Sequence, residues 1–308
     1  MSEPSPPSII IAGSLNIDLV VRVSRFPEVG ETITGEDLKT IPGGKGANQA
    51  AAAARLGAPT ALVGRVGKDA YGETLIDQME SFTVDTGQVT IDETCSTGTA
   101  VILVNEQGAN KIVLSPGANS RVTAEDIDRV EPLFASAQLL LLQLEIPLDT
   151  VSYAADQAAR AGLRVILNPA PAAELPVSLL EKTDILVPNE TELELLSDRA
   201  VSDLESAAQA ARSLLEHGLE TVIVTLGDQG SLIVTRKNQQ HLPAPEVEAV
   251  DTTAAGDAFV GGLAAALTRG FSREEAVRYA NCAGALAATK FGAQPSLPNP
   301  EEIAQLYP

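Results

Sequence analysis

Four short apolar runs in the second half of the chain constrain its fold most strongly. They lie at residues 139–142, 165–167, 185–187 and 222–224, and none of them contains a polar residue. Helical patterns near residues 150–161 and 203–218 separate these runs. Strands without a polar face, spaced by helices, are typical of a parallel sheet that helices cover on both sides. We therefore predict an α/β fold with a doubly wound, mainly parallel sheet flanked by helices.

The first 120 residues show a different pattern. A buried strand is expected at residues 8–12, and extended segments follow at 18–23 and 32–39. Alternating segments at 99–104 and 111–115 are joined by the polar loop 105–110, which is typical of a hairpin. Together they predict a small β-sheet lid, inserted at about 18–40 and 97–116 into a single domain spanning 1–308. Exposed apolar residues on such a sheet would offer a surface for a homodimer.

Composition excludes several classes of protein. The 21 basic and 41 acidic residues give a net charge of −20, which argues against nucleic acid as a partner. Two cysteines and two histidines are too few for a disulfide framework or a Cys/His zinc cluster. No run of about 18 apolar residues exists, and the apolar run 9–12 is too short for the core of a signal peptide. We expect a cytoplasmic protein without a membrane partner.

The segment DTTAAGD at residues 251–257 carries the clearest chemical signal. Its small residues Ala254, Ala255 and Gly256 precede a helix expected at 256–269, whose free N–H groups and dipole favour an anion such as phosphate. Asp257 would repel that anion unless it accepts a proton from an attacking hydroxyl. The alternative is an ordinary acidic residue in the first turn of a helix.

Polar residues follow each of the apolar runs, where the carboxyl ends of parallel strands hold ligands. Glu145 follows the first run, Asn168 the second, and the segment NETE at 189–192 the third. Asn189 and Glu192 fit either a helix cap or a site that orders Mg²⁺ and its waters. The segment TLGDQG at 225–230 fits either a loop beneath a nucleotide, with Thr225, Gly227 and Gly230, or a plain hairpin turn.

Two further motifs lie near the start of the chain. In GSLNID, residues 13–18, Asn16 and Asp18 project to the same side of an extended segment, which suits sugar hydroxyls or an Asx-rich turn. In GGKGANQA, residues 43–50, Lys45 is followed by Gly46, so the segment is no Walker motif. A helix from about 47 to 56 would present Lys45 and Asn48 on one side, although the glycines alone could be structural.

Together the motifs at 13–18, 43–50, 189–192 and 251–257, in this order, resemble the ribokinase-like carbohydrate kinase family over residues 9–296. The resemblance implies ATP-dependent phosphorylation of D-ribose at its 5-hydroxyl, with Asp257 as the catalytic base. It implies an anion hole formed by the backbone of Ala254, Ala255 and Gly256. It also implies Mg²⁺ and an activating K⁺ as cofactors, and a homodimer formed through the lid.

The resemblance also assigns the other residues of the site. The sugar would be held, together with Asp257, by Asn16, Asp18, Gly44, Lys45, Asn48 and Glu145. The nucleotide would contact Asn189, Thr225, Gly227, Gly230, Gly256 and Asn281. Glu192 would help to place Mg²⁺ indirectly, and K⁺ would lie among Asp251, Thr253, Ala287, Lys290, Gly292 and Ser296.

Two positions depart from the family pattern, and other functions stay open. Asn281 stands where some members carry histidine near the adenine, and Ala254 stands where related kinases often have glycine. The alternatives are a kinase for another furanose or a nucleoside, or a non-catalytic sugar- or nucleotide-binding protein. A dehydrogenase would need Gly-x-Gly-x-x-Gly after the first strand, where Gly13, Ser14, Leu15 and Asn16 stand instead.

Overall fold

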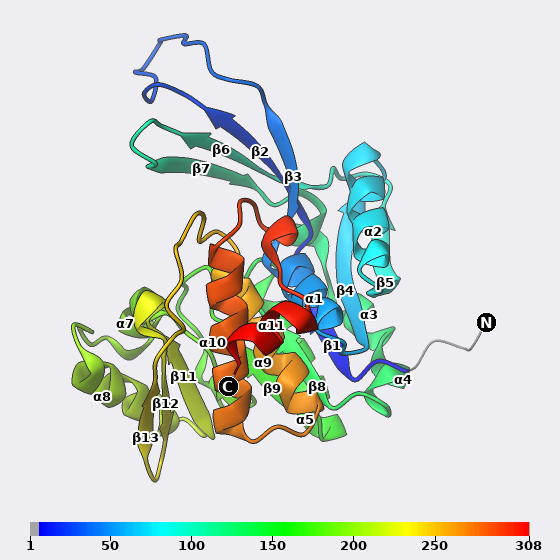
Figure 1. Ribbon diagram of the computed structural model, residues 1–308. Coiled ribbons are helices and arrows are strands. Elements are labelled where there is room, and N and C mark those ends of the chain that lie inside the picture. Colours follow the sequence, from blue (N-terminus) through cyan, green and yellow to red (C-terminus); the bar gives the residue numbers. More distant parts are fainter. Residues whose placement is uncertain (1–5, 308) are drawn as a thin grey trace.

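The computed structural model describes residues 6–307; the remaining ends of the predicted domain, residues 1–5 and 308, lie outside the described part. Its main sheet has nine strands in the order β13-β12-β11-β10-β9-β8-β1-β4-β5 (Figure 1). The strands are β1 (Ile9–Ala12), β4 (Thr60–Gly67), β5 (Asp85–Asp92), β8 (Leu139–Leu142), β9 (Arg164–Leu167), β10 (Ile185–Leu186), β11 (Thr221–Thr225), β12 (Ser231–Thr235) and β13 (Gln239–Leu242). All neighbours from β5 to β11 pair in parallel, and only β12 runs in the opposite direction, pairing antiparallel with both β11 and β13.

Both faces of this sheet are covered by helices. Ile9 and Ile11 of β1 point into one hydrophobic core, and Ile10 and Ala12 point into the other. The first core includes side chains of α1 (Lys45–Arg55), α2 (Ala70–Ser81), α9 (Ala255–Thr268), α10 (Arg273–Ala288) and α11 (Pro300–Leu306). The second includes those of α3 (Ala124–Asp128), α4 (Glu131–Phe134), α5 (Leu148–Ala161), α6 (Val177–Leu180), α7 (Glu190–Ser197) and α8 (Leu204–Leu215). The predicted fold class is confirmed.

A separate sheet of four strands stands above the helices in Figure 1. Its order is β3-β2-β6-β7, with β2 (Asn16–Arg22), β3 (Lys39–Gly43), β6 (Gly98–Val104) and β7 (Asn110–Ser115). The central pair β2 and β6 is parallel, and the outer strands are antiparallel to them. We call these four strands the small sheet.

The strand expected at residues 32–39 was wrong in position. Residues 31–38 form no strand, and β3 instead runs through Pro42 and Gly43. The pairing of β2 with β3 ends at Val20 and Lys39. The stretch before Lys39 contains Gly35, Glu36 and Asp37, which are poor strand formers. Strand pairing therefore uses the beginning of the glycine-rich motif itself, and this brings Gly44 next to the first residue of β2.

Two strands of the main sheet, β5 and β13, were not predicted. Both lie at its edges, and both carry polar residues, as in the DTGQVTID sequence of β5 and the QQHL sequence of β13. An edge strand is paired on one side only and is often polar. A search for continuous apolar runs therefore does not find it.

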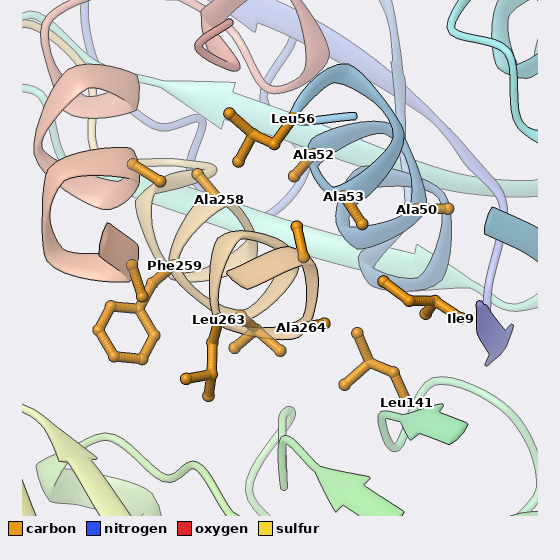
Figure 2. Close-up of a cluster of buried hydrophobic side chains, with 14 of the residues drawn as sticks. Ile9, Ala50, Ala52, Ala53, Leu56, Leu141, Ala258, Phe259, Leu263 and Ala264 are labelled. Atoms are coloured by element: carbon orange, nitrogen blue, oxygen red, sulfur yellow. The ribbon is translucent and has the colours of Figure 1, made fainter. Parts of the chain in front are cut away.

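Helices α1 and α9 pack through very small residues (Figure 2). A Cβ atom added at Gly261 of α9 would lie 2.6 Å from the Cβ of Ala52 and 2.7 Å from the carbonyl oxygen of Gln49. The two helix backbones therefore approach closely, and α1 is brought beside the first turn of α9. Among the described helices, none combines the length and the apolar composition that crossing a membrane requires.

Candidate active site

A cavity of about 720 Å³ opens at the carboxyl ends of the parallel strands. Eleven of the residues expected to hold the nucleotide, the sugar or a cation, or to act in catalysis, line it. They are Lys45, Asn189, Glu192, Thr225, Gly227, Gly230, Thr253, Ala255, Gly256, Asp257 and Asn281. Residues more than 200 positions apart in the sequence are thus brought together around one space, as expected for a doubly wound sheet.

The N-terminus of α9 forms one wall of the cavity. A Cβ atom added at Gly256 would meet nothing within 4 Å, so the space in front of this helix end is open. Of the three expected anion-hole residues, Ala255 already donates its N–H to the carbonyl of Thr252 at 3.1 Å. A phosphate would therefore meet the positive end of the helix dipole beside Gly256.

Asp257 lies in the first turn of α9, with only 6% of its surface exposed. Its two carboxylate oxygens accept hydrogen bonds from α1: Oδ2 from Asn48 Nδ2 at 2.9 Å and Oδ1 from Gln49 Nε2 at 3.0 Å. Burial raises the pKa of Asp257, while the charge of Lys45 and the two amide hydrogen bonds oppose that rise. A buried carboxylate with a raised pKa is suited to act as a proton acceptor.

Glu145 ties together the ends of β1 and β8, which are neighbours in the sheet. Its oxygen Oε2 accepts from Ser14 Oγ at 2.5 Å, from the backbone N–H of Lys45 at 3.1 Å and from Asn16 Nδ2 at 3.5 Å. All three donors reach the same oxygen. Oε1 therefore keeps its capacity to accept a hydrogen bond from a ligand hydroxyl.

Asp18 and Lys45 face the same region. Burial, together with the charges of Glu145 and Asp257, raises the pKa of Asp18 to about 6. Burial alone would lower the pKa of Lys45, but the charges of Asp257, Glu145 and Glu192 outweigh it and raise that pKa. One ammonium group thus balances a cluster of carboxylates.

Gly44 has a structural reason to be glycine. Its φ of 90° is in the left-handed region, and an added Cβ would lie 2.7 Å from the backbone nitrogen of Asn16. The backbone of the glycine-rich motif therefore touches the start of β2. This contact places Lys45, the first residue of α1, beside Asn16.

The segment 189–192 forms a reciprocal helix cap at the start of α7. Asn189 Oδ1 accepts from the N–H of Glu192 at 2.8 Å, and Glu192 Oε2 accepts from the N–H of Asn189 at 2.9 Å. Burial raises the pKa of Glu192. Asn189 and Glu192 also line the cavity, so their role as a helix cap does not exclude a role in the ligand site.

The loop 225–230 contains a short 3-10 turn and connects the antiparallel strands β11 and β12, as the hairpin interpretation predicts. Thr225, Gly227 and Gly230 of this loop also line the cavity, as the nucleotide-loop interpretation predicts.

Asn281 of α10 donates to the carbonyl oxygens of Leu242 at 3.1 Å and Pro243 at 3.4 Å. It therefore connects α10 to the segment that follows β13, at the edge of the cavity.

The residues expected around K⁺ come from two loops and the end of α10. Asp251 joins these loops: its Oδ1 accepts from the N–H and hydroxyl of Thr253, and its Oδ2 accepts from the N–H of Gly292 at 2.9 Å. The Ser296 hydroxyl donates to the carbonyl of Ala293. The ammonium of Lys290 pairs instead with Glu302, so only its backbone is available to the loop.

Four buried amides at the site were not assigned a role from the sequence. Asn119 accepts from the N–H of Leu15 at 3.0 Å and donates to Leu15 O at 2.9 Å and Asn16 Oδ1 at 2.7 Å. Since Asn16 Oδ1 is an acceptor there, its Nδ2 must face Glu145. The other three are Gln49, Gln143 and Asn168, which hydrogen-bond to one another. In the sequence, Gln49 is marked only by its position after Asn48. Gln143 and Asn168 are marked only by their positions after the apolar runs 139–142 and 165–167.

Comparisons with known proteins agree with this geometry. A sequence model of the pfkB family carbohydrate kinases matches residues 7–300. A ribokinase of Haemophilus influenzae is 41% identical over 298 residues, 97% of each chain. A deoxyribokinase of Salmonella typhi is 40% identical over 296 residues, 96% of this chain and 97% of its own. The solved structure of Arabidopsis thaliana ribokinase complexed with ribose and ATP has a TM-score of 0.91 and 34% identity, covering 98% of this chain and 99% of that one.

Proposed function

The chain belongs to the pfkB family of carbohydrate kinases, and we propose that it transfers the γ-phosphoryl group of ATP to the 5-hydroxyl of D-ribose. One observation carries this proposal. Asp257 lies between a polar cluster suited to a sugar and an open helix N-terminus that faces a cavity large enough for a nucleotide. A base placed between an alcohol site and a phosphate site is what phosphoryl transfer to an alcohol requires.

In the proposed reaction, the oxygen of the sugar 5-hydroxyl bonds to the γ-phosphorus of ATP, and Asp257 accepts the proton that this hydroxyl loses. The bond from that phosphorus to the bridging oxygen breaks, and ADP and ribose 5-phosphate result. The helix end at Gly256 stabilises the negative charge that spreads over the transferred group. Lys45, with its raised pKa, stays protonated beside the reacting oxygens.

The polar cluster accounts for the choice of a sugar. Asp18, Glu145 Oε1 and Asn48 Oδ1 are acceptors, and Lys45 is a donor, so the site can pair with several hydroxyls. Asn48 Oδ1 is buried and has no partner among the described residues. A site with unpaired buried groups discriminates against ligands that lack the matching hydroxyl.

Mg²⁺ and K⁺ are proposed as cofactors. Mg²⁺ is commonly held by one or two carboxylates, water and substrate phosphates. Two buried carboxylates line the cavity, Asp257 and Glu192; Asp257 is given the role of base, and Glu192 would orient the water around Mg²⁺. Mg²⁺ would neutralise charge on the β- and γ-phosphates. The loops at Asp251 and Ser296 offer oxygen atoms from backbone and hydroxyl groups, which suits a hard cation such as K⁺.

A homodimer formed through the small sheet is proposed as the assembly. Val101, Ile112, Val113 and Leu114 on its strands are all exposed, with Val113 at 68%. Apolar groups gathered on one sheet favour a protein partner, and a second copy presents the same surface. The sheet would also act as a lid over the sugar. The cytoplasmic location stays a prediction from the sequence.

A second candidate substrate is 2-deoxyribose, because a deoxyribokinase is nearly as similar to this chain as the ribokinase is, at 40% against 41% identity. The two sugars differ only in the 2-hydroxyl. Hydrogen-bonding capacity at the site favours ribose, since each acceptor left unpaired by deoxyribose costs binding free energy.

The experiment measures ADP formation with ATP and Mg²⁺ against ribose, 2-deoxyribose, fructose and adenosine, in K⁺ and in Na⁺. Asp257→Asn is the control; it should remain folded and bind ATP while turnover falls roughly 10²-fold or more. We expect ribose to be preferred and K⁺ to increase the rate. Preference for another acceptor would show that the substrate is not ribose. ATP binding without turnover would indicate a non-catalytic binding protein.

A further inference from the structure

Three buried amide side chains form a connected group behind Asp257. Gln49 comes from α1, Gln143 directly follows β8, and Asn168 directly follows β9. Gln49 and Gln143 are fully buried and Asn168 is 9% exposed. Gln49 Nε2 donates to Asp257 Oδ1 and to Asn168 Oδ1, both at 3.0 Å, and Gln143 Nε2 donates to Gln49 Oε1 at 2.6 Å.

The orientation of each amide in this group is determined by its neighbours. Asn168 Nδ2 donates to the carbonyl oxygen of Val187 at 3.0 Å, so its Oδ1 must face Gln49 as an acceptor. The ionised Asp257 carboxylate is also only an acceptor. Gln49 therefore commits both amide hydrogens, one to Asn168 and one to Asp257, and its Oε1 must accept from Gln143. Turning the Gln49 amide over would place oxygen against oxygen at two contacts.

The two amides that touch Asp257 differ in what else they can do. Asn48 holds Oδ2, and its own Oδ1 has no partner among the described residues, so a sugar hydroxyl can engage it. Gln49 is saturated on both its nitrogen and its oxygen. It can hold Oδ1 in place throughout the reaction without being drawn toward a ligand.

The group is not arranged for packing stability alone. Gln143 Oε1 is buried without a partner in the described part of the chain and points at Gly13, where an added Cβ would lie 2.1 Å from it. An unpaired buried carbonyl carries a free-energy cost that an apolar side chain would avoid. A purely structural contact would be expected to use leucine or methionine at such positions.

We propose that Gln49 is a positioning residue, which keeps Asp257 ionised and turned toward the attacking hydroxyl, with Asn168 and Gln143 fixing the orientation of its amide. The inference rests on the proposed function, since it gives Asp257 the role of base. The other charged groups around Asp257 are Lys45 from α1, Asp18 from β2, Glu145 from the loop after β8, and Glu192 from α7. Among these charged groups, only Lys45 favours the ionised form of Asp257. If the hydrogen bond from Gln49 is lost, no second cation compensates for it.

The test compares Gln49→Met with the wild-type protein over a range of pH. Methionine keeps the length of the side chain and removes its hydrogen bonds. Because the bond from Gln49 lowers the pKa of Asp257, its loss should move the acidic limb of the rate against pH upward by roughly one unit. On the acidic limb kcat should therefore fall by up to about tenfold, and at high pH the two rates should approach each other, while the KM for the sugar changes little.

Gln143→Met is the matched control, since it makes the same substitution in the same group but leaves both hydrogens of Gln49 in place. It should move the acidic limb less than Gln49→Met. Gln49→Asn, which draws the amide back by one methylene, provides a second variant if Gln49→Met folds poorly, and it should move the limb in the same direction. Equal shifts in Gln49→Met and Gln143→Met, or an equal loss of rate at every pH, would overturn the proposal.

A measurement without substrate separates this inference from the proposed function. Carbon-13 NMR of aspartate carboxyls, with Asp257→Asn used for assignment, reports the pKa of Asp257 directly. That pKa should be higher in Gln49→Met than in the wild type even if no sugar is turned over. An unchanged Asp257 pKa would contradict the role of Gln49, whereas absent turnover with a changed pKa would contradict only the proposed reaction.

Discussion

Asp18 is the residue whose charge is least compensated in the site. It is half-buried near Glu145 and Asp257, and no group within residues 6–307 donates a hydrogen bond to its carboxylate. Its pKa of about 6, raised by burial and by these two charges, means that the folded protein holds the Asp18 proton more tightly than the unfolded chain does. Stability should therefore fall as the pH rises from about 4 to about 6, and stay lowered above that range.

Asp18→Asn should remove this penalty. At pH 8 the variant should be more stable than the wild type by roughly 1–3 kcal/mol, while its affinity for the sugar falls. At pH 4 the two proteins should differ much less, because Asp18 is then protonated in the folded state and already partly protonated in the unfolded chain, where its pKa is 3.8. Calorimetric melting temperatures at both pH values measure the effect. Equal melting temperatures at pH 8 would show that the charge is compensated.

Sequence motifs identified the charged residues of the site and the amides Asn16 and Asn48 beside them, but they gave no role to Gln49 or Asn119. Asp257, Lys45 and Glu145 are charged, and charges next to glycines or after apolar runs attract attention in a sequence. Gln49 and Asn119 act through hydrogen bonds to residues about 100 to 200 positions away. An isolated glutamine or asparagine looks the same in a motif as on a surface, so only the folded arrangement shows its partners.

At the scale of elements, the contact between α1 and α9 determines where the base lies. Both helices were predicted to within two residues of their observed starts, because alanine and glycine runs with a clear first turn are easily found. Their close approach was not predicted. It depends on which small residues face one another, and a helical pattern alone does not contain that information.

Two adjacent glycines of α9 test this contact. Gly261→Ala should lower the free energy of unfolding by up to about 2 kcal/mol, because overpacking against Ala52 outweighs the better helix propensity of alanine. It should also lower kcat by shifting Asp257 relative to Gln49. Thermal unfolding and turnover of the purified variant are the measurements.

Gly262→Ala is the matched control on the same turn. An added Cβ at Gly262 would lie closest to α10, with Ala283 at 3.0 Å and Ala280 at 3.6 Å, and would meet only the end of the Leu56 side chain, just after α1, at 3.6 Å. We expect it to leave stability nearly unchanged, within about 1 kcal/mol, because propensity offsets the milder contact. If the two variants lost equal stability, the α1–α9 contact would not be the critical one.

At the scale of the whole molecule, the proposed homodimer is open to a direct test. Successive residues of a strand point to opposite faces, so Ile112 and Val113 of β7 lie on the two faces of the small sheet. Ile112→Lys and Val113→Lys should therefore differ in oligomeric state: the lysine on the face that forms the interface should convert the dimer to a monomer, and the lysine on the other face should leave the dimer intact. Sedimentation of the wild type and both variants gives the answer. A monomeric wild type, or two unaffected variants, would exclude this interface.

The topology of the small sheet affects how the chain folds while the ribosome is still synthesising it. β2 lies between β3 and β6, and its first residue, Asn16, pairs with Gly98, roughly 80 residues later. At about 5–20 residues per second, β2 waits roughly 4–16 s after its synthesis before β6 is made, and β3 waits roughly 3–12 s. During that interval one edge of β2, rich in leucine and valine, lacks its native partner, and it is then that the nascent chain has its best opportunity to pair with another chain.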